Sequence, residues 1–169
     1  MTNKFRIFVD GSYDPDYNIG TIAYHIQDTI NYGNKVIKMN IHNNVFATKL
    51  FRCKNSFDAE LSAIALGLDT LKRFILINPV LKKVPVRIKS DNITLIKYIT
   101  KEQIKVGCED YFDGIDLDYL EDVKQRYKEL KFIYPNFKLS YIPSKKNLAH
   151  NNAFEMLRLE RGLVNWLKK

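Results

Sequence analysis

The stretch FRIFVDGS, residues 5–12, alternates apolar side chains with others until it reaches an aspartate. Phe5, Ile7 and Val9 occupy every second position, which is typical of a strand with one buried face. Asp10 follows them directly and precedes a glycine. An aspartate in this place is either a turn residue, as it commonly is before glycine, or a carboxylate presented where a strand ends. The local sequence supports both interpretations.

Two segments further along the chain repeat this alternation of apolar residues, at 20–26 and at 35–41. Turn-forming residues precede and separate them, with Asn18 before the first and the cluster 31–34 between the two. Together with the segment at 4–9, this order predicts an antiparallel meander of three strands.

From Ser56 the pattern changes, and apolar residues recur at spacings of three and four, as they do in an amphipathic helix. Ser56 is the expected N-cap, and the Asn-Pro pair at 78–79 ends the segment. The remaining elements that we expect are a strand at 84–90, helices at 93–99 and 117–130, a strand at 137–142 and a helix at 148–167. The order β-β-β-α-β-α-α-β-α predicts a mixed α/β (α+β) fold, in which a five-stranded mixed sheet carries helices on its faces in a single domain over residues 1–169.

The composition is that of a folded globular protein, with 46% hydrophobic and 27% charged residues among 169. No apolar run reaches the roughly 18 residues that a membrane helix needs, and the N-terminal residues lack the apolar segment of a signal peptide. Cys53 and Cys108 have no CxxC partner, so we expect free thiols in a reducing compartment. We therefore expect a cytoplasmic, nucleoid or nuclear protein, neither secreted nor bound to a membrane, and a monomer.

The chain is strongly basic, with 27 Lys and Arg against 19 Asp and Glu, a net charge of +8. Seven of the acids lie between Glu109 and Asp122, so the rest of the surface is more basic still. Small basic domains commonly bind polyanions, of which nucleic acid is the most frequent. Charge alone does not identify the partner.

Three carboxylates occupy positions that surface solvation does not explain. Asp10 ends the first predicted strand, Asp91 follows the fourth, and Glu60 lies at the side of the apolar stripe of the first helix. Each has an ordinary alternative role: Asp10 as a turn residue, Asp91 as a helix N-cap, and Glu60 as a boundary residue that reaches solvent.

The expected topology brings these acids together. A right-handed crossover makes the first and fourth strands parallel neighbours, so Asp10 and Asp91 emerge at one edge of the sheet, with the start of the Glu60 helix over it. Three carboxylates there repel one another unless a cation is bound. Oxygen ligands suit Mg²⁺ or Mn²⁺, and two such ions about 4 Å apart promote in-line attack of water on a phosphodiester.

Three segments, FRIFVDGS, SFDAELSAIALGL and VRIKSDN, follow one another in an order that resembles type 1 ribonuclease H, from Lys4 to the last helix. The resemblance implies a ribonuclease H-like fold and an endonuclease that uses two divalent ions, Mg²⁺ or Mn²⁺, to cleave the RNA strand of RNA–DNA hybrids. It implies that Asp10 bridges both metals. Glu60 would hold one metal and contact the RNA 2′-hydroxyl, and Asp91 would hold a metal and help to place the attacking water.

The start of the last helix departs from the family pattern. The family carries a fourth carboxylate there, after an Asn, two residues and an Ala, whereas here Ala149 is followed by His150. Some reverse-transcriptase-like relatives in plants are similar in carrying Ala-His. We therefore predict His150 as the fourth catalytic and metal-binding residue, the alternative being that it merely fills a helix face.

Further residues near these four are candidates for holding the hybrid, which proteins recognise by shape, phosphates and 2′-hydroxyls. Gly11 and Ser12 permit a close approach of the backbone beside Asp10. Asn55 and Ser56 lead into the first helix, and the basic residues Lys145 and Lys146 precede the last helix.

Two other functions fit the same sequence. The first is a nucleic-acid-binding module on this fold whose catalysis is weakened by His150. The second is a related DNA nuclease or junction resolvase. A cleavage assay with divalent ions on hybrid, double-stranded RNA and DNA distinguishes the three.

Overall fold

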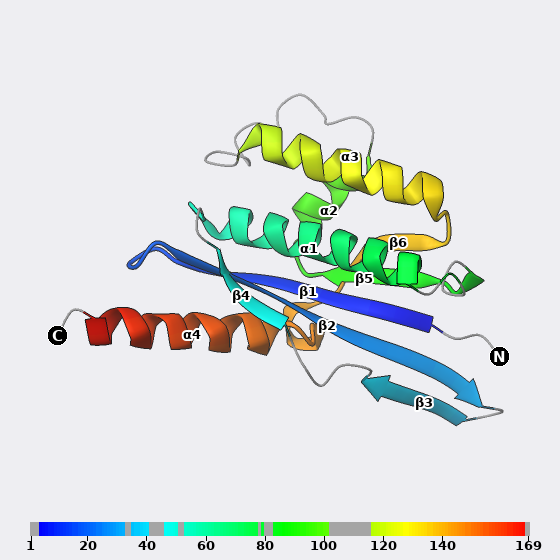
Figure 1. The fold of residues 1–169 in the computed structure, drawn as a ribbon, viewed down its shortest axis with the longest axis horizontal. Coiled ribbons are helices and arrows are strands. Elements are labelled where there is room, and N and C mark those ends of the chain that lie inside the picture. Colours follow the sequence, from blue (N-terminus) through cyan, green and yellow to red (C-terminus); the bar gives the residue numbers. More distant parts are fainter. Residues whose placement is uncertain are drawn as a thin grey trace.

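The computed structural model describes residues 4–32, 35–40, 46–50, 53–77, 79, 83–101 and 116–167. Its strands are β1 (Lys4–Asp14), β2 (Ile19–Tyr32), β3 (Lys35–Asn40), β4 (Phe46–Leu50), β5 (Val86–Ser90) and β6 (Phe137–Tyr141). Its helices are α1 (Ser56–Ile77), α2 (Ile93–Thr100), α3 (Leu117–Ile133), the short 3₁₀ helix η3 (Ser144–Lys146) and α4 (His150–Leu167) (Figure 1). Of the predicted turn cluster at 31–34, residues 33 and 34 lie outside the described residues, as does Cys108.

The strands form one mixed sheet in the order β3-β2-β1-β5-β6, with β4 also paired to β2. The three-stranded antiparallel meander is confirmed, and so is the parallel pairing of the first strand with the strand that follows the first helix. The predicted count of five strands is wrong. β3 pairs with Gln27–Tyr32 and β4 with Gly20–Tyr24, so two short strands share one side of β2. The sequence of β4, FATKL, has apolar residues at positions 46, 47 and 50, so the alternation that predicts a strand is missing there.

The first strand is longer than its apolar alternation indicates. β1 continues to Asp14, and Asp10 lies within it, paired in register with Ala23 of β2. The interpretation of Asp10 as a turn residue is therefore wrong. Asp14 has that role, because its Oδ1 accepts hydrogen bonds from the backbone N–H groups of Asp16 and Tyr17. The predicted turn residue Asn18 closes this hairpin with a φ of 52°.

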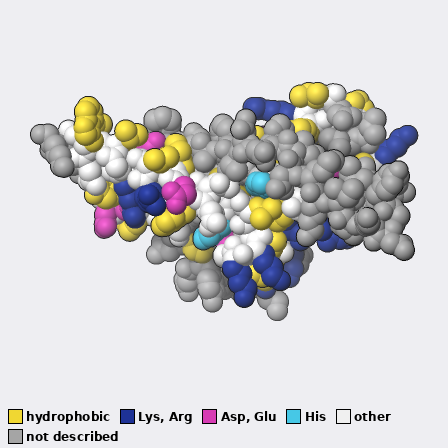
Figure 2. All heavy atoms as spheres, turned by 90° about the horizontal axis from the view of Figure 1, so that it is seen from below, with side chains coloured by type: hydrophobic (Ala, Val, Ile, Leu, Met, Phe, Trp, Pro, Cys, Tyr) yellow, Lys and Arg dark blue, Asp and Glu magenta, His cyan; other side chains and the backbone are white. Residues whose placement is uncertain are grey.

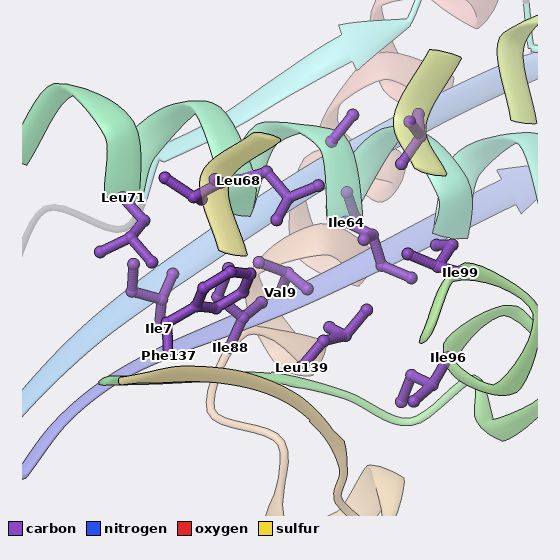
Figure 3. Packing of buried hydrophobic residues seen from close by; sticks show 14 of the residues in the cluster. Ile7, Val9, Ile64, Leu68, Leu71, Ile88, Ile96, Ile99, Phe137 and Leu139 are labelled. Atoms are coloured by element: carbon purple, nitrogen blue, oxygen red, sulfur yellow. The ribbon is translucent and has the colours of Figure 1, made fainter. Parts of the chain in front are cut away.

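One face of the sheet carries the main hydrophobic core, under α1, α2 and α3 (Figure 1). Alternate strand residues such as Val9 and Ile88 meet apolar residues of α1 such as Leu68 (Figure 3). Gly67 allows this close approach, because a Cβ there would lie 2.7 Å from Cγ1 of Val9 and 3.2 Å from Cγ2 of Ile88. The helix therefore lies directly on the two central parallel strands.

The other face of the sheet is partly covered by α4 (Figure 1). A small cluster holds it there, in which Phe8 and Ala23 of the sheet pack with Ala149 and Ala153. The Thr21 hydroxyl donates a 2.7 Å hydrogen bond to the carbonyl oxygen of Ala153, which fixes the helix against β2. None of the helices in the described part of the chain is long and apolar enough to cross a membrane.

Candidate metal centre

Asp10 and Asp91 are brought together by the parallel pairing of β1 with β5. Phe8 and Lys89 are partners in that register, and each aspartate stands two residues further along its own strand direction. Asp10 is only 1% exposed. Asp91 does not cap the following helix, because Asn92 does so by accepting a 3.0 Å hydrogen bond from the N–H of Leu95. The Asp91 carboxylate is thus available for another role.

The start of α1 is held by a different residue from the one predicted. Ser56 is the first helical residue rather than the N-cap. The side chain of Asn55 accepts a 2.9 Å hydrogen bond from the N–H of Asp58, and the Asp58 carboxylate accepts one of 3.0 Å from the N–H of Lys54. Asn55, nominated as a substrate contact, is engaged in capping, and these bonds fix where the helix begins.

Gly11 sets the distance between this helix and β1. A Cβ at Gly11 would lie 2.3 Å from the carbonyl carbon and oxygen of Ala59 and 2.6 Å from the nitrogen of Glu60. Only a glycine lets the second turn of the helix approach the strand so closely. The contact brings Glu60 beside Asp10, and the backbone of Gly11 hydrogen-bonds to the Glu60 carboxylate.

The three acids lie close enough for their ionised forms to repel one another. Burial and, to a smaller extent, repulsion from Asp91 and hydrogen bonding to it together raise the pKa of Asp10 to about 8. Burial likewise raises the pKa of Glu60 well above its usual value, with added repulsion from Asp10 and Asp91, while the Gly11 hydrogen bond opposes the shift. Within the described residues, Oε2 of Glu60 and Oδ1 of Asp91 are buried without a hydrogen-bond partner. A bound cation would relieve both the repulsion and the missing contacts.

His150 joins the acids at the first residue of α4. Its Nδ1 lies 3.2 Å from Oδ2 of Asp10, and its side chain is 46% exposed. One potential ligand atom from each of Asp10, Asp91 and His150 lies within 4.8 Å of the others. The structure therefore brings His150 next to Asp10 and Asp91.

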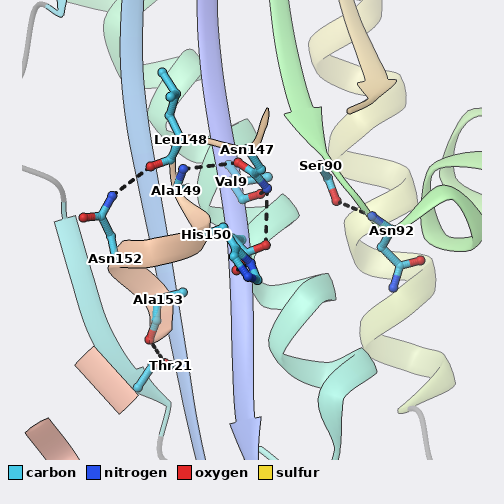
Figure 4. A network of polar contacts seen from close by, with 11 residues as sticks. Val9, Thr21, Ser90, Asn92, Asn147, Leu148, Ala149, His150, Asn152 and Ala153 are labelled. Carbon is cyan, nitrogen blue, oxygen red and sulfur yellow. Dashed lines mark hydrogen bonds and ion pairs between the residues drawn. The ribbon is translucent and has the colours of Figure 1, made fainter. Parts of the chain in front are cut away.

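Asn147 orients this arrangement, although the sequence did not single it out. Its side-chain amide donates to Oδ1 of Asp10 at 3.2 Å and to the carbonyl oxygen of Val9 at 2.9 Å, and its own Oδ1 accepts from the N–H of Ala149 (Figure 4). One buried side chain thus joins β1 to the start of α4. Asn147 is not the Asn of the family pattern, because one residue rather than two separates it from Ala149, and no local signal in the sequence distinguishes it.

The remaining residues predicted to contact the hybrid are close in sequence to residues of the centre. Ser12 lies two residues beyond Asp10 in β1, half-buried and opposite Thr21. Lys145 and Lys146 lie in η3, directly before Asn147, and are exposed. Figure 2 views the face that carries α4 and shows lysine and arginine side chains gathered near histidine side chains.

No protein-family model and no curated protein matches this sequence. Solved structures do match it. Ribonuclease H1 from Halobacterium salinarum aligns over 90% of this chain and 98% of its own, at 13% identity and a TM-score of 0.56. The ribonuclease H1 LC11, isolated from compost by a metagenomic approach, aligns over 91% and 98%, at 15% identity and a TM-score of 0.59. LC11 solved in complex with an RNA/DNA hybrid aligns over 90% and 99%, at 14% identity and a TM-score of 0.55. The chain therefore has the ribonuclease H fold.

Proposed function

We propose that this chain is a metal-dependent endonuclease that hydrolyses the RNA strand of RNA–DNA hybrids. The observation that carries the proposal is the cluster of Asp10, Asp91 and His150 on a ribonuclease H fold, with Glu60 near enough to be repelled by both aspartates. A structural neighbour has been solved with an RNA/DNA hybrid, which supports the choice of substrate. The net charge of +8 supports a polyanionic partner.

The side chains present fit a pair of divalent cations. Asp10, Asp91 and His150 would hold one ion, and Asp10 with Glu60 the other. Carboxylate oxygens suit Mg²⁺ and Mn²⁺, and the buried oxygens of Glu60 and Asp91 that lack partners among the described residues are free to coordinate. When bound, the two ions supply positive charge at the scissile phosphate and lower the pKa of a bound water.

The chain itself supplies orientation. Asn147 donates to one oxygen of Asp10, so the other oxygen is directed towards His150. Glu60, next to which Gly11 lets β1 pass closely, would contact an RNA 2′-hydroxyl. Asp91, uncommitted to helix capping, would position the attacking water. Lys145 and Lys146, exposed beside the centre, would hold the phosphate backbone.

A cleavage assay tests this function. The purified chain is incubated with an RNA–DNA hybrid, double-stranded RNA and double-stranded DNA, with Mg²⁺, Mn²⁺ or EDTA. We expect cleavage of the RNA strand of the hybrid with a divalent ion and none with EDTA. The matched control is Asp10→Asn, which should be inactive and folded. Cleavage of DNA would favour the resolvase-like alternative.

One observation favours a second function, a nucleic-acid-binding module. His150 stands in place of a carboxylate, so the centre has one negative charge fewer with which to hold a cation. In that case the chain binds the hybrid without cutting it. Cleavage gained only by a His150→Asp variant would establish the binding module.

A further inference from the structure

Four cations form a second charged region on the sheet. Arg6 of β1, Arg87 of β5 and Lys138 of β6 are consecutive register partners across three neighbouring parallel strands. Lys89, two residues beyond Arg87, is the register partner of Ser140. We call these residues the cation row; they are Arg6, Arg87, Lys89 and Lys138.

The cation row faces away from the main core. Ile7, Ile88 and Leu139 are the chain neighbours of the row, and all three are buried in the cluster under α1. Because successive side chains of a strand point to opposite faces, the row lies on the face that carries α4. Arg87 and Lys138 are exposed, and the other two are partly buried.

The arrangement is unfavourable for the isolated chain. Neighbouring strands lie about 4.8 Å apart, and like charges directly opposite one another destabilise a sheet. No carboxylate in the described part of the chain forms an ion pair with any member of the row. Within the described residues, no carboxylate neutralises the positive charge of the row, so its side chains can bind anionic groups of a partner.

The cation row is continuous with the candidate metal centre. Asp10 stands four residues beyond Arg6 on the same face of β1, and Asp91 stands two residues beyond Lys89. At about 3.3 Å per residue, Lys89 lies about 7 Å from Asp91 and Arg6 about 13 Å from Asp10, and the larger distance is the length of about four base pairs of duplex. α4 begins at His150 and extends over β1, β2 and β4, whereas the row spans β1, β5 and β6 (Figure 1).

We propose that Arg6, Arg87, Lys89 and Lys138 bind the sugar–phosphate backbone of a nucleic acid duplex where it extends past the metal centre. This inference rests on the proposed function, since the centre fixes which molecule lies beside the row. Phosphates repeat at short, regular intervals along a duplex, so a row of cations on a sheet can contact several of them regardless of base sequence. A membrane-binding face would instead need apolar side chains to insert, and in the described chain no member of the row has an exposed large hydrophobic residue as register partner.

The test compares two pairs of substitutions, each removing one Arg and one Lys. Arg87→Ala/Lys138→Ala changes exposed members of the row, and Lys72→Ala/Arg73→Ala changes exposed residues of α1, which lies on the other face. Binding of a 20-base-pair RNA–DNA hybrid is measured by fluorescence anisotropy in EDTA over a series of salt concentrations. Because each lost phosphate contact lowers the slope of log affinity against log salt by about 1, we expect the first pair to lower it by about 2 and to weaken binding. The α1 pair should leave the slope unchanged.

Two further measurements separate the outcomes. Arg87→Lys keeps the charge and should keep the slope, which excludes a general disturbance of β5. Cleavage is assayed separately with Mn²⁺. The parent protein could cleave hybrid while Arg87→Ala/Lys138→Ala binds it with the parental slope. This result would overturn the proposal that the cation row binds the duplex backbone and would leave the proposed function intact. If the parent never cleaves, but Arg87→Ala/Lys138→Ala shows the expected loss of slope, the nuclease function is refuted and the row is retained as a nucleic-acid contact.

Discussion

The two faces of the central sheet are built from alternate residues of the same strands, yet they have opposite character. In β5, Val86 and Ile88 are buried under α1, whereas Arg87 and Lys89 belong to the cation row on the other face. In β1, Val9 packs in the core and Asp10, one residue later, is a buried acid beside Asp91 and His150. Alternate residues of one strand thus pack in the core, and the residues between them carry the charged side chains of the other face. Changes at adjacent positions should therefore have effects of different kinds.

The largest expected effect is at Asp10, on the chemical face. Asp10→Asn should reduce hybrid cleavage by at least about a thousandfold, the order seen when a group that stabilises developing charge is removed. Stability of the metal-free chain should be unchanged or slightly raised, because one of three repelling acids becomes neutral. Single-turnover assays measure the rate of hybrid cleavage, and thermal unfolding in EDTA measures the stability of the metal-free chain. Parental cleavage by this variant would remove Asp10 from the mechanism.

The adjacent pair Ile88 and Arg87 sharpens the contrast between the faces. Ile88→Ala empties part of the core under α1 and should lower the free energy of unfolding by about 2–5 kcal/mol. Arg87→Ala, on an exposed side chain, should change it by no more than about 0.5 kcal/mol. Urea unfolding of both variants checks this. Equal losses would show that the two faces are not energetically distinct.

The acids should also make the stability of the metal-free chain depend on pH. The pKa of Asp10 is about 8 in the folded chain, against an ordinary value of 3.8. Between these values the folded state holds a proton that the unfolded state has released. The stabilisation is therefore complete below about pH 4 and is lost as pH rises to about 8. We expect a loss of about 1–3 kcal/mol that is absent from Asp10→Asn. Unfolding curves of the parent and of Asp10→Asn at pH 5 and pH 8 in EDTA give the change in the free energy of unfolding for each protein. An equal change in both proteins would contradict the assignment of this pH dependence to Asp10.

The smallest expected effect concerns the ion that His150 favours. An imidazole is a softer ligand than a carboxylate and is neutral when it binds a metal. Mn²⁺ should therefore support faster cleavage than Mg²⁺ by about tenfold, equivalent to about 1.4 kcal/mol. His150→Asp should remove the preference, and His150→Ala should lower the rate with either ion. Identical rates for all three proteins would make His150 an ordinary helix residue.

Much of the fold could be predicted from local sequence because its signals are local. Alternation at positions 5, 7 and 9 and helical spacing from Ser56 each arise from the burial of one face. Apart from the missed strand β4, the errors occurred where several residues compete for one role. Asn55, Asn92 and Asp14 took the capping and turn roles that had been considered for Ser56, Asp91 and Asp10. Neighbouring polar residues have similar capping propensities, so only the geometry of the backbone selects among them.

The sequence by itself determined the order of the helices and of all strands except β4, the net charge and the three acidic motifs that resemble ribonuclease H. It could not show that Gly11 allows α1 to reach β1, that Asn147 joins Asp10 to α4, or that Arg6, Arg87 and Lys138 form one row. These contacts join residues far apart in the chain, and they depend on strand register and helix placement. Local patterns record which face a residue occupies. Its neighbours across the sheet are decided only when hydrogen bonding fixes the register and packing brings the helices onto the strands.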